Sequence, residues 1–244
     1  NKAAPARSWV IFETTSLRKS KFSLHYNRWA RSLSNPWKRG AGMIFLRYES
    51  LREYLRYYPV TSAILALNLL VFLADLVLEG RPLFEAGAFV QHPVFDRYGL
   101  LEPWRYVTSI FLHAGWEHLL FNAFSILVFA PPLERLIGHF RYAVFWLLAG
   151  ILGNVFSAAV NLGGDFRVAV GASGAVYGVF GAYLYLALFR KHAMDEASRK
   201  TVYSILLFGL LYSIISPRID IWAHAGGCLA GFLMLGMLVQ SRGR

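Results

Sequence analysis

The sequence is poor in cysteine and in charge. Its single cysteine, Cys228, excludes an intrachain disulfide and the small scaffolds that depend on one. Only 16% of its 244 residues are charged, against about 25% in soluble domains, while 56% are hydrophobic. Acidic residues are the scarcer kind, 14 against 25 basic ones. These shortages favour a chain whose main solvent is a lipid bilayer.

Two further patterns are missing from the sequence. No segment repeats elsewhere in the chain, so an inverted-repeat transporter lacks its usual sequence support. The metalloprotease pattern HExxH is also absent, and His113 and His118 are five residues apart, which is not the spacing that places two ligands on one helix face. We therefore expect neither a metal site nor a cofactor.

Apolar stretches of about 20 residues, the length that spans the hydrocarbon of a bilayer, recur along the chain. Interior polar residues interrupt them, as is typical of a bundle that buries some helix faces against protein. The predicted fold is an all-α polytopic membrane protein with a long first outer loop at 79–117. Its six predicted spans are residues 59–78, 118–133, 142–162, 168–189, 201–216 and 221–240.

The segment 1–56 contains no predicted span and holds 12 of the 25 Lys and Arg residues. We interpret residues 1–42 as weakly ordered, and Met43 as an alternative start that would make the residues before it non-native. After Met43 the stretch IFLRYESLREYLRYY is amphipathic, which predicts that Ile44, Phe45, Leu51 and Leu55 dip into the membrane interface. An ordinary cytosolic tail is the alternative.

The distribution of Lys and Arg predicts the orientation of the chain, because loops rich in these residues stay in the cytoplasm. With the N-terminus inside, the inner segments hold 20 Lys and Arg and the outer loops hold 5. Without the N-terminal segment the inner segments still hold 8. Both termini are therefore expected in the cytoplasm, and the basic excess needs no nucleic acid to explain it.

Polar side chains gather at one end of the three spans that run from outside to inside. His118 and Asn122 lie at i and i+4 on the second span, Ser173 lies about one turn into the fourth, and His224 lies about one turn into the sixth. Gly174 and Gly178, like Gly227 and Gly231, have the small-xxx-small spacing that allows two membrane helices to approach closely. Close approach would bring Ser173 within reach of His224.

A serine and a histidine in contact suggest acyl transfer, with His224 as the general base for Ser173. Asp165 and Asp220 lie at loop positions, so the pattern favours a dyad over a triad. His118, Asn122 and the Ser173 N–H are candidate oxyanion donors. The alternatives remain a packing motif for the glycine-rich stretch, a pore-lining role for His224, and interhelical hydrogen bonding for Asn122.

Five separated motifs follow one another along the chain: the pair Trp104-Arg105; FLHAGWEHLLFN with His113, His118 and Asn122; Glu134-Arg135 with Gly138; GASG with Gly171, Ser173 and Gly174; and AHAGGCLAG with His224, Gly227 and Gly231. In this order, over about residues 57–240, they resemble the motifs of the rhomboid intramembrane serine proteases. One departure is Pro131-Pro132, which is expected to end or bend the second helix early.

The resemblance implies a six-transmembrane-helix rhomboid bundle at 57–241, a Ser173–His224 dyad, and an oxyanion site from His118, Asn122 and the Ser173 N–H. It also implies that Tyr177 packs against the His224 ring, that the fifth helix and first outer loop gate the site, and that substrates are single-span membrane proteins cut in or near the bilayer.

The sequence thus predicts an intramembrane endopeptidase of a cell membrane, with a bacterial inner membrane as the expected location. Its expected partners are transmembrane protein substrates and the lipid bilayer, without nucleic acid or metal. One rival is a rhomboid-like scaffold that binds spans without cutting them. Another is a small-molecule transporter that uses the same polar residues.

Overall fold

The computed structural model of the chain describes residues 44–162, 164–216 and 219–241. The predictions for residues 1–42 lie outside this part of the chain. The elements in order are α2 Leu51–Tyr57, α3 Pro59–Val77, α4 Pro82–Gly87, β1 Phe89–Gln91, α5 Arg105–Thr108, the 3-10 helix η1 Ser109–Phe111, α6 Trp116–Ile137, α7 His139–Val160, β2 Arg167–Ala169, α8 Ser173–Phe189, the 3-10 helix η2 Lys191–Ala193, α9 Glu196–Ile215 and α10 Ile221–Gln240.

The fold is almost entirely helical, as predicted. Among the described residues, α3, α6, α7 and α10 are long and apolar enough to cross a membrane, and α8 is apolar but has only 17 residues. Helix α9 has 20 residues, but its first turns carry Glu196, Arg199 and Lys200. The count of six spans therefore stays a prediction.

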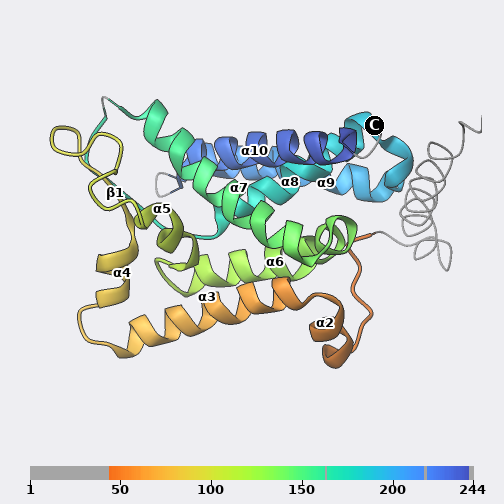
Figure 1. Cartoon of the computed structure of the whole chain (residues 1–244), viewed down its shortest axis with the longest axis horizontal. Helices are drawn as coiled ribbons and strands as arrows, with labels where there is room; N and C mark the ends of the chain where they lie inside the picture. The colour runs from red at the N-terminus through yellow and green to blue at the C-terminus, as the bar shows by residue number, and fades with distance from the viewer. Residues whose placement is uncertain (1–43, 163, 217–218, 242–244) are drawn as a thin grey trace, which may run out of the picture. The chain divides into compact units, whose positions relative to one another are not determined.

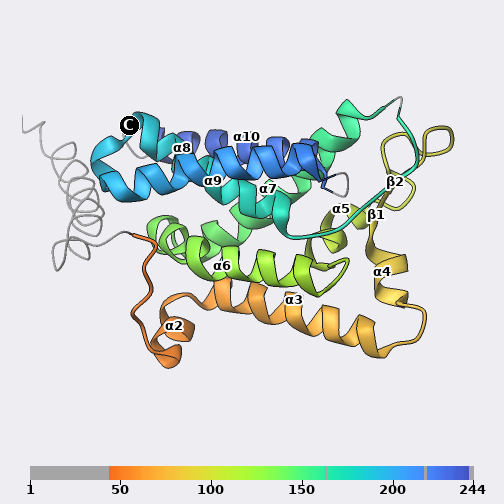
Figure 2. The same ribbon diagram turned by 180° about the vertical axis from the view of Figure 1, so that it is seen from behind.

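The long helices run side by side, and α6, α8 and α10 all begin at the end of the bundle that carries α4, α5 and the two strands (Figures 1 and 2). Helix α2 lies near the opposite end. The three helix starts are the positions where the sequence places histidine, asparagine and serine. The arrangement thus brings these polar residues to the same end of the bundle.

Helices α8 and α10 pack backbone against backbone. A Cβ atom on Gly227 would clash with the carbonyl oxygen of Gly174, and one on Gly231 would clash with that of Gly178. The close approach predicted from the glycine spacing is therefore present, and these positions accept only glycine without a shift of one helix.

Of the two effects expected at Pro131-Pro132, an early end of the helix does not occur, because α6 continues to Ile137. A proline lacks the N–H that would bond the carbonyl four residues earlier, which for Pro131 is the carbonyl of Leu127. The hydroxyl of Tyr54 donates to that carbonyl at 3.0 Å. A partner from another helix therefore satisfies the group that the proline leaves free.

Glu134 joins α6 to the start of α3. Its fully buried carboxylate accepts hydrogen bonds from the Val60 N–H at 3.0 Å, the Thr61 N–H at 2.8 Å and the Thr61 hydroxyl at 2.6 Å. A carboxylate at a helix N-terminus satisfies N–H groups that have no partner within the helix. This one side chain thus sets the position of α3 against α6.

The predicted outer loop at 79–117 contains regular structure. It holds α4, β1, α5 and η1, and β1 pairs antiparallel with β2, so that Phe89 lies opposite Ala169. The prediction that the fourth span begins at residue 168 was also wrong, because Val168 is in β2 and α8 begins at Ser173. Between them Gly171 adopts a φ of 126°, which ends the strand and turns the chain into the helix.

The region before α3 differs in part from the amphipathic prediction. Ile44 and Phe45 are buried against protein, and the Phe45 ring packs edge-on to Phe129 at 4.9 Å between ring centroids. Leu51 and Leu55 are exposed on α2, as a helix lying at a membrane surface requires. Before α2, Phe45 therefore packs on α6 and the Ile44 N–H donates to the Ser198 hydroxyl of α9 at 2.9 Å, so both residues contact protein instead of lipid.

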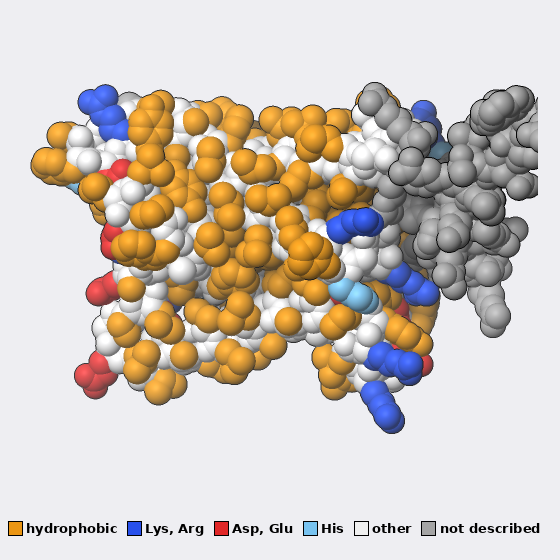
Figure 3. Space-filling model, viewed as in Figure 1, with side chains coloured by type: hydrophobic (Ala, Val, Ile, Leu, Met, Phe, Trp, Pro, Cys, Tyr) orange, Lys and Arg blue, Asp and Glu red, His pale blue; other side chains and the backbone are white. Residues whose placement is uncertain are grey.

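The surface has the pattern of a membrane-embedded protein. Figure 3 shows hydrophobic side chains over the middle of the bundle, with Asp and Glu gathered toward the end that carries α4 and most Lys and Arg toward the end that carries α2. Many large apolar side chains of α3, α6 and α9 are exposed, including Leu70, Phe121 and Phe208. Lipid is the solvent in which such a surface is stable.

Candidate functional site

Ser173 is the first residue of α8 and is partly exposed. Its position is set by the preceding turn, in which the Gly171 N–H donates to the carbonyl of Ser109 at 2.8 Å. The N–H groups in the first turn of a helix have no partner within that helix. Ser173 therefore combines a hydroxyl with backbone donors that are available to an anion.

His224 lies one turn into α10 and is buried by its contact with α8. Its ring stacks on Tyr177, with 4.0 Å between ring centroids and 11° between ring planes. This is the contact that the resemblance implied. Because Tyr177 is four residues after Ser173, both lie on the face of α8 that meets His224.

The structure has no hydrogen bond between Ser173 and His224 in the described part of the chain. Such bonds are often long before a substrate binds and tighten in the reacting complex. The observed geometry is thus a serine one helical turn from the residue on which the histidine ring stacks. The direct contact of hydroxyl and imidazole stays a prediction.

Ser213 contacts His224, which the sequence did not reveal. The Ser213 Oγ lies 3.0 Å from Nδ1 of His224, and both side chains are buried. Serine is common in membrane helices, and nothing in the apolar sequence of α9 indicates that this one meets a histidine of α10. Ser204 of the same helix also stands between Tyr and Ile, so the local sequence does not distinguish Ser213 from it.

His118 reaches the turn before Ser173. A Cβ atom on Gly171 would lie 2.5 Å from Cε1 and 2.7 Å from Nε2 of the His118 ring, so only glycine fits beside this imidazole. The Ala114 N–H donates to Nδ1 of His118 at 3.4 Å, which leaves the proton on Nε2. Nε2–H is thus a donor beside the loop that leads to Ser173.

Asn122 lies one turn after His118 and is buried. Its Nδ2 donates to the carbonyl of His118 at 2.8 Å. The amide nitrogen has two N–H donors, and this bond uses one of them. The second donor remains for another acceptor.

His113 lies directly before α6 and is almost fully buried, with its ring edge-on to His118 at 5.2 Å between centroids. Among the described residues, neither of its ring nitrogens has a hydrogen-bond partner. Burial, together with the nearby His118, lowers the pKa of His113 to about 3. A neutral His113 therefore supports the His118 ring by packing.

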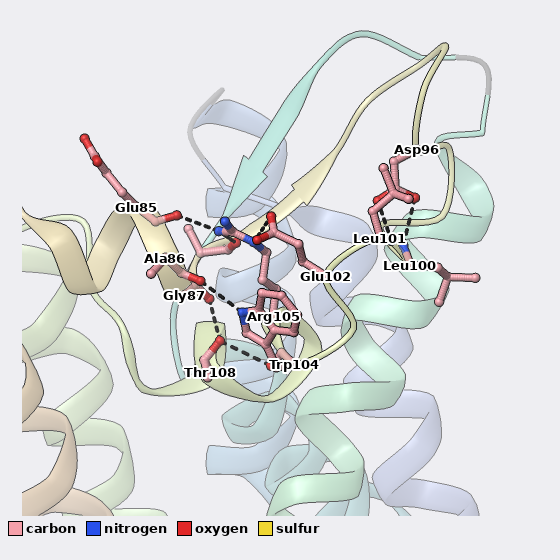
Figure 4. A network of polar contacts seen from close by, with 11 residues as sticks. Glu85, Ala86, Gly87, Asp96, Leu100, Leu101, Glu102, Trp104, Arg105 and Thr108 are labelled. Carbon is pink, nitrogen blue, oxygen red and sulfur yellow. Dashed lines mark hydrogen bonds and ion pairs between the residues drawn. The ribbon is translucent and has the colours of Figure 1, made fainter.

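Trp104 and Arg105 hold the outer segment together (Figure 4). The Arg105 guanidinium donates to the carbonyls of Glu85 at 2.7 Å and Ala88 at 2.8 Å and pairs with Glu102 at 2.7 Å. The Trp104 indole donates to the carbonyl of Ala86 at 3.1 Å. The pair thus fastens α5 to the end of α4, and in the described part of the chain it has no hydrogen bond or ion pair with Ser173 or His224.

No three His, Cys, Asp or Glu side chains in the described ranges lie close enough together to hold a metal ion. The side chains that the described helices bring to this site are imidazoles, an amide and hydroxyls, all of which can form hydrogen bonds. Such a set can transfer protons and stabilise an oxyanion.

Comparisons with known proteins agree on one family. The Rhomboid domain model matches residues 101–241, a range that includes every candidate site residue from Trp104 to Gly231. A Bacillus subtilis (strain 168) protein named "Putative rhomboid protease YdcA" is 37% identical over 201 residues, which are 82% of this chain and 99% of that protein.

More distant relatives share the central part of the chain. "Rhomboid protease GluP" of the same organism is 32% identical over 137 residues, 56% of this chain and 26% of that protein. "RHOMBOID-like protein 5" of Arabidopsis thaliana is 34% identical over 134 residues, 54% of this chain and 43% of that protein.

Proposed function

The chain belongs to the rhomboid family, and we propose that it cleaves single-span membrane proteins with Ser173 as nucleophile and His224 as general base. It is a serine protease, a hydrolase of peptide bonds, embedded in a membrane through several apolar helices. The observation that carries the residue assignment is the stacking of Tyr177 on His224, one turn from Ser173.

The proposed first step forms an acyl-enzyme. His224 accepts the Ser173 proton as the Ser173 oxygen attacks the substrate carbonyl carbon, and the carbonyl oxygen becomes an oxyanion. When the intermediate collapses, the C–N bond breaks and the imidazolium gives its proton to the leaving amine. Water then attacks the acyl carbon while His224 accepts its proton; the bond from the acyl carbon to the Ser173 oxygen breaks, and His224 gives that proton to Ser173, which leaves as the hydroxyl.

The proposed oxyanion donors are Nε2–H of His118, the amide of Asn122 and the Ser173 N–H. The contact of the His118 ring with Gly171 and the free donor of Asn122 support this assignment. Loss of one such donor typically costs about 10²–10³ in kcat. The backbone donor benefits further from the start of α8, where the helix dipole favours negative charge.

A substrate span must unwind to react, because helical carbonyls are occupied by their own hydrogen bonds. We propose that it enters past α9 and the segment 79–117, and that water reaches the site from the outer side. The many exposed apolar side chains of α9 are consistent with a helix that faces lipid and an incoming span.

We also propose that both termini face the cytoplasm. The gathering of Lys and Arg at the α2 end of the bundle in Figure 3 supports this orientation. A reporter fused after Arg190 should then report from the cytoplasm. An external signal would reverse the assignment of inner and outer ends.

The proposed activity is tested with a purified single-span substrate in proteoliposomes. The wild type should cleave it, while Ser173→Ala and His224→Ala should lose at least about 10³ in rate. A fluorophosphonate should label Ser173 in the wild type and fail to label it in His224→Ala. The control is Ser204→Ala, an exposed serine of α9, which should cleave like the wild type.

Undiminished cleavage by Ser173→Ala or His224→Ala would reject the dyad. Capture of the substrate by wild type without any cleavage would instead favour a scaffold that binds spans.

A further inference from the structure

Ser213 of α9 occupies a position from which it can orient the His224 ring. Its Oγ lies 2.7 Å from the carbonyl oxygen of Gly209 and 3.0 Å from Nδ1 of His224. Both side chains are buried, so water does not compete freely for these bonds. The hydroxyl thus bridges the backbone of one helix and the imidazole of another.

The number of protons available decides the direction of the two bonds. A serine hydroxyl carries one hydrogen and two lone pairs, and a carbonyl oxygen can only accept. Since the hydroxyl donates to Gly209, it must accept from His224, and the proton of the neutral imidazole is therefore on Nδ1. Nε2 then carries the lone pair.

From this geometry we infer that Ser213 is a positioning residue that holds His224 in the tautomer needed to accept a proton at Nε2. The inference rests on the proposed Ser173–His224 dyad. Tyr177 sets the plane of the ring by stacking, and Ser213 sets which ring nitrogen faces away from α9. Ser213 plays this part without touching the substrate.

The bond also makes the histidine depend on the position of α9. This helix has only three buried residues, Ser198 and Val202 in its first two turns and Ser213 near its end. Gly209 of α9 also contacts α8. The Tyr177 hydroxyl lies so close to Gly209 that a Cβ atom on this glycine would clash with the hydroxyl. If α9 moves aside to admit a substrate, His224 loses its acceptor, and its tautomer is fixed again only when α9 returns.

The test measures kcat, KM and the rate of fluorophosphonate labelling of Ser173 for the full chain in proteoliposomes. Ser213→Ala should lower kcat and the labelling rate about 10- to 100-fold, because a buried Nδ1–H loses its acceptor, with KM changed less than about threefold. Ser213→Thr keeps the hydroxyl and should restore activity to within about threefold of wild type.

Two control variants separate the histidine contact from general effects on α9. Ser204→Ala makes the same substitution at an exposed site of the helix. Thr201→Ala removes a hydroxyl that bonds only its own helix, at the carbonyl of Ala197. Both should keep the wild-type kcat.

A spectroscopic measurement tests the tautomer without relying on cleavage. Nitrogen NMR of the chain labelled in histidine, with His224 assigned by its loss in His224→Gln, should show a protonated Nδ1 and an unprotonated Nε2. In Ser213→Ala the signal should become a mixture of both tautomers.

The outcomes separate the two proposals. A wild-type kcat for Ser213→Ala, while Ser173→Ala is inactive, would overturn the role of Ser213 and leave the dyad intact. A protonated Nε2 in the wild type would overturn it as well. Loss of the dyad would appear as unchanged cleavage by Ser173→Ala. If Ser213→Ala fails to fold, Ser213→Thr and the wild-type spectrum still decide.

Discussion

Replacing Gly227 by alanine should separate the two helices that carry Ser173 and His224. The added Cβ atom would lie 2.0 Å from the carbonyl oxygen of Gly174, and protein Cβ atoms do not approach other atoms closer than 3.0 Å. The obstacle is backbone on the facing helix, which cannot rotate away. Helix α10 must therefore move from α8 by about 1 Å, the difference between these two distances.

The expected cost has two parts. Overpacking of a close interface destabilises by about 1–3 kcal/mol, which should lower the thermal unfolding midpoint in detergent. A displacement of about 1 Å at reacting groups can cost roughly 10²-fold in rate. We expect kcat for a single-span substrate to fall by that factor in protein that remains folded.

Gly236→Ala is the matched control on the same helix. Its Cβ atom would meet the edge of the Tyr185 ring at 3.0 Å, and a side chain can yield by a few tenths of an ångström. This variant should keep kcat within about threefold of wild type. A Gly227→Ala enzyme that is as active and as stable as Gly236→Ala would refute the argument that backbone contact between α8 and α10 sets the site.

Three further substitutions test the supports of the site. Arg105→Lys should lower the free energy of unfolding by about 1–3 kcal/mol and speed limited proteolysis of the segment 79–115. The reason is that one ammonium group cannot bond two carbonyls and Glu102 together. Proteolysis at the wild-type rate would contradict this. Glu134→Ala should cost about 3 kcal/mol or more, since three donors, two of them buried, lose their acceptor, whereas an unchanged unfolding midpoint would mean that water replaces the carboxylate. Burial lowers the pKa of His113 from 6.5 to about 3 in the folded chain. Between these pH values the unfolded chain binds more protons than the folded chain, so protonation of His113 favours unfolding. The folded state is therefore unaffected by this histidine above about pH 6.5 and loses stability as the pH falls toward 3. Unfolding midpoints followed over that range should depend less on pH in His113→Gln, and identical curves would show that this histidine is not responsible.

Local patterns in the sequence predicted much of the helical structure. The span predicted at 221–240 coincides with α10, because an apolar run follows Asp220, whose carboxylate caps the helix at Trp222 and Ala223. The start of α9 was placed five residues late, at 201, since its first turns are charged and look like a loop. The cap at Asp195 starts the helix there.

Other features depended on partners that are distant along the chain. At Pro131 in α6, the carbonyl left without its helical partner accepts a hydrogen bond from the Tyr54 hydroxyl, 73 residues away. Residue 168 lies in a strand instead of a helix because β2 pairs with β1, and α5, η1, α6 and α7 lie between these two strands along the chain. Neither partner can be read from local composition.

The sequence by itself determined the membrane character of the chain, the positions of its apolar helices and the residue types that acyl transfer requires. It did so because apolar runs and glycine spacing are patterns within one continuous stretch of chain. The family resemblance implied the contact of Tyr177 with His224, but only the tertiary structure decided that His118 lies against Gly171 and that Ser213 contacts Nδ1 of His224. These contacts join side chains from different helices, and their distances depend on how closely the backbones pack, which no local pattern specifies.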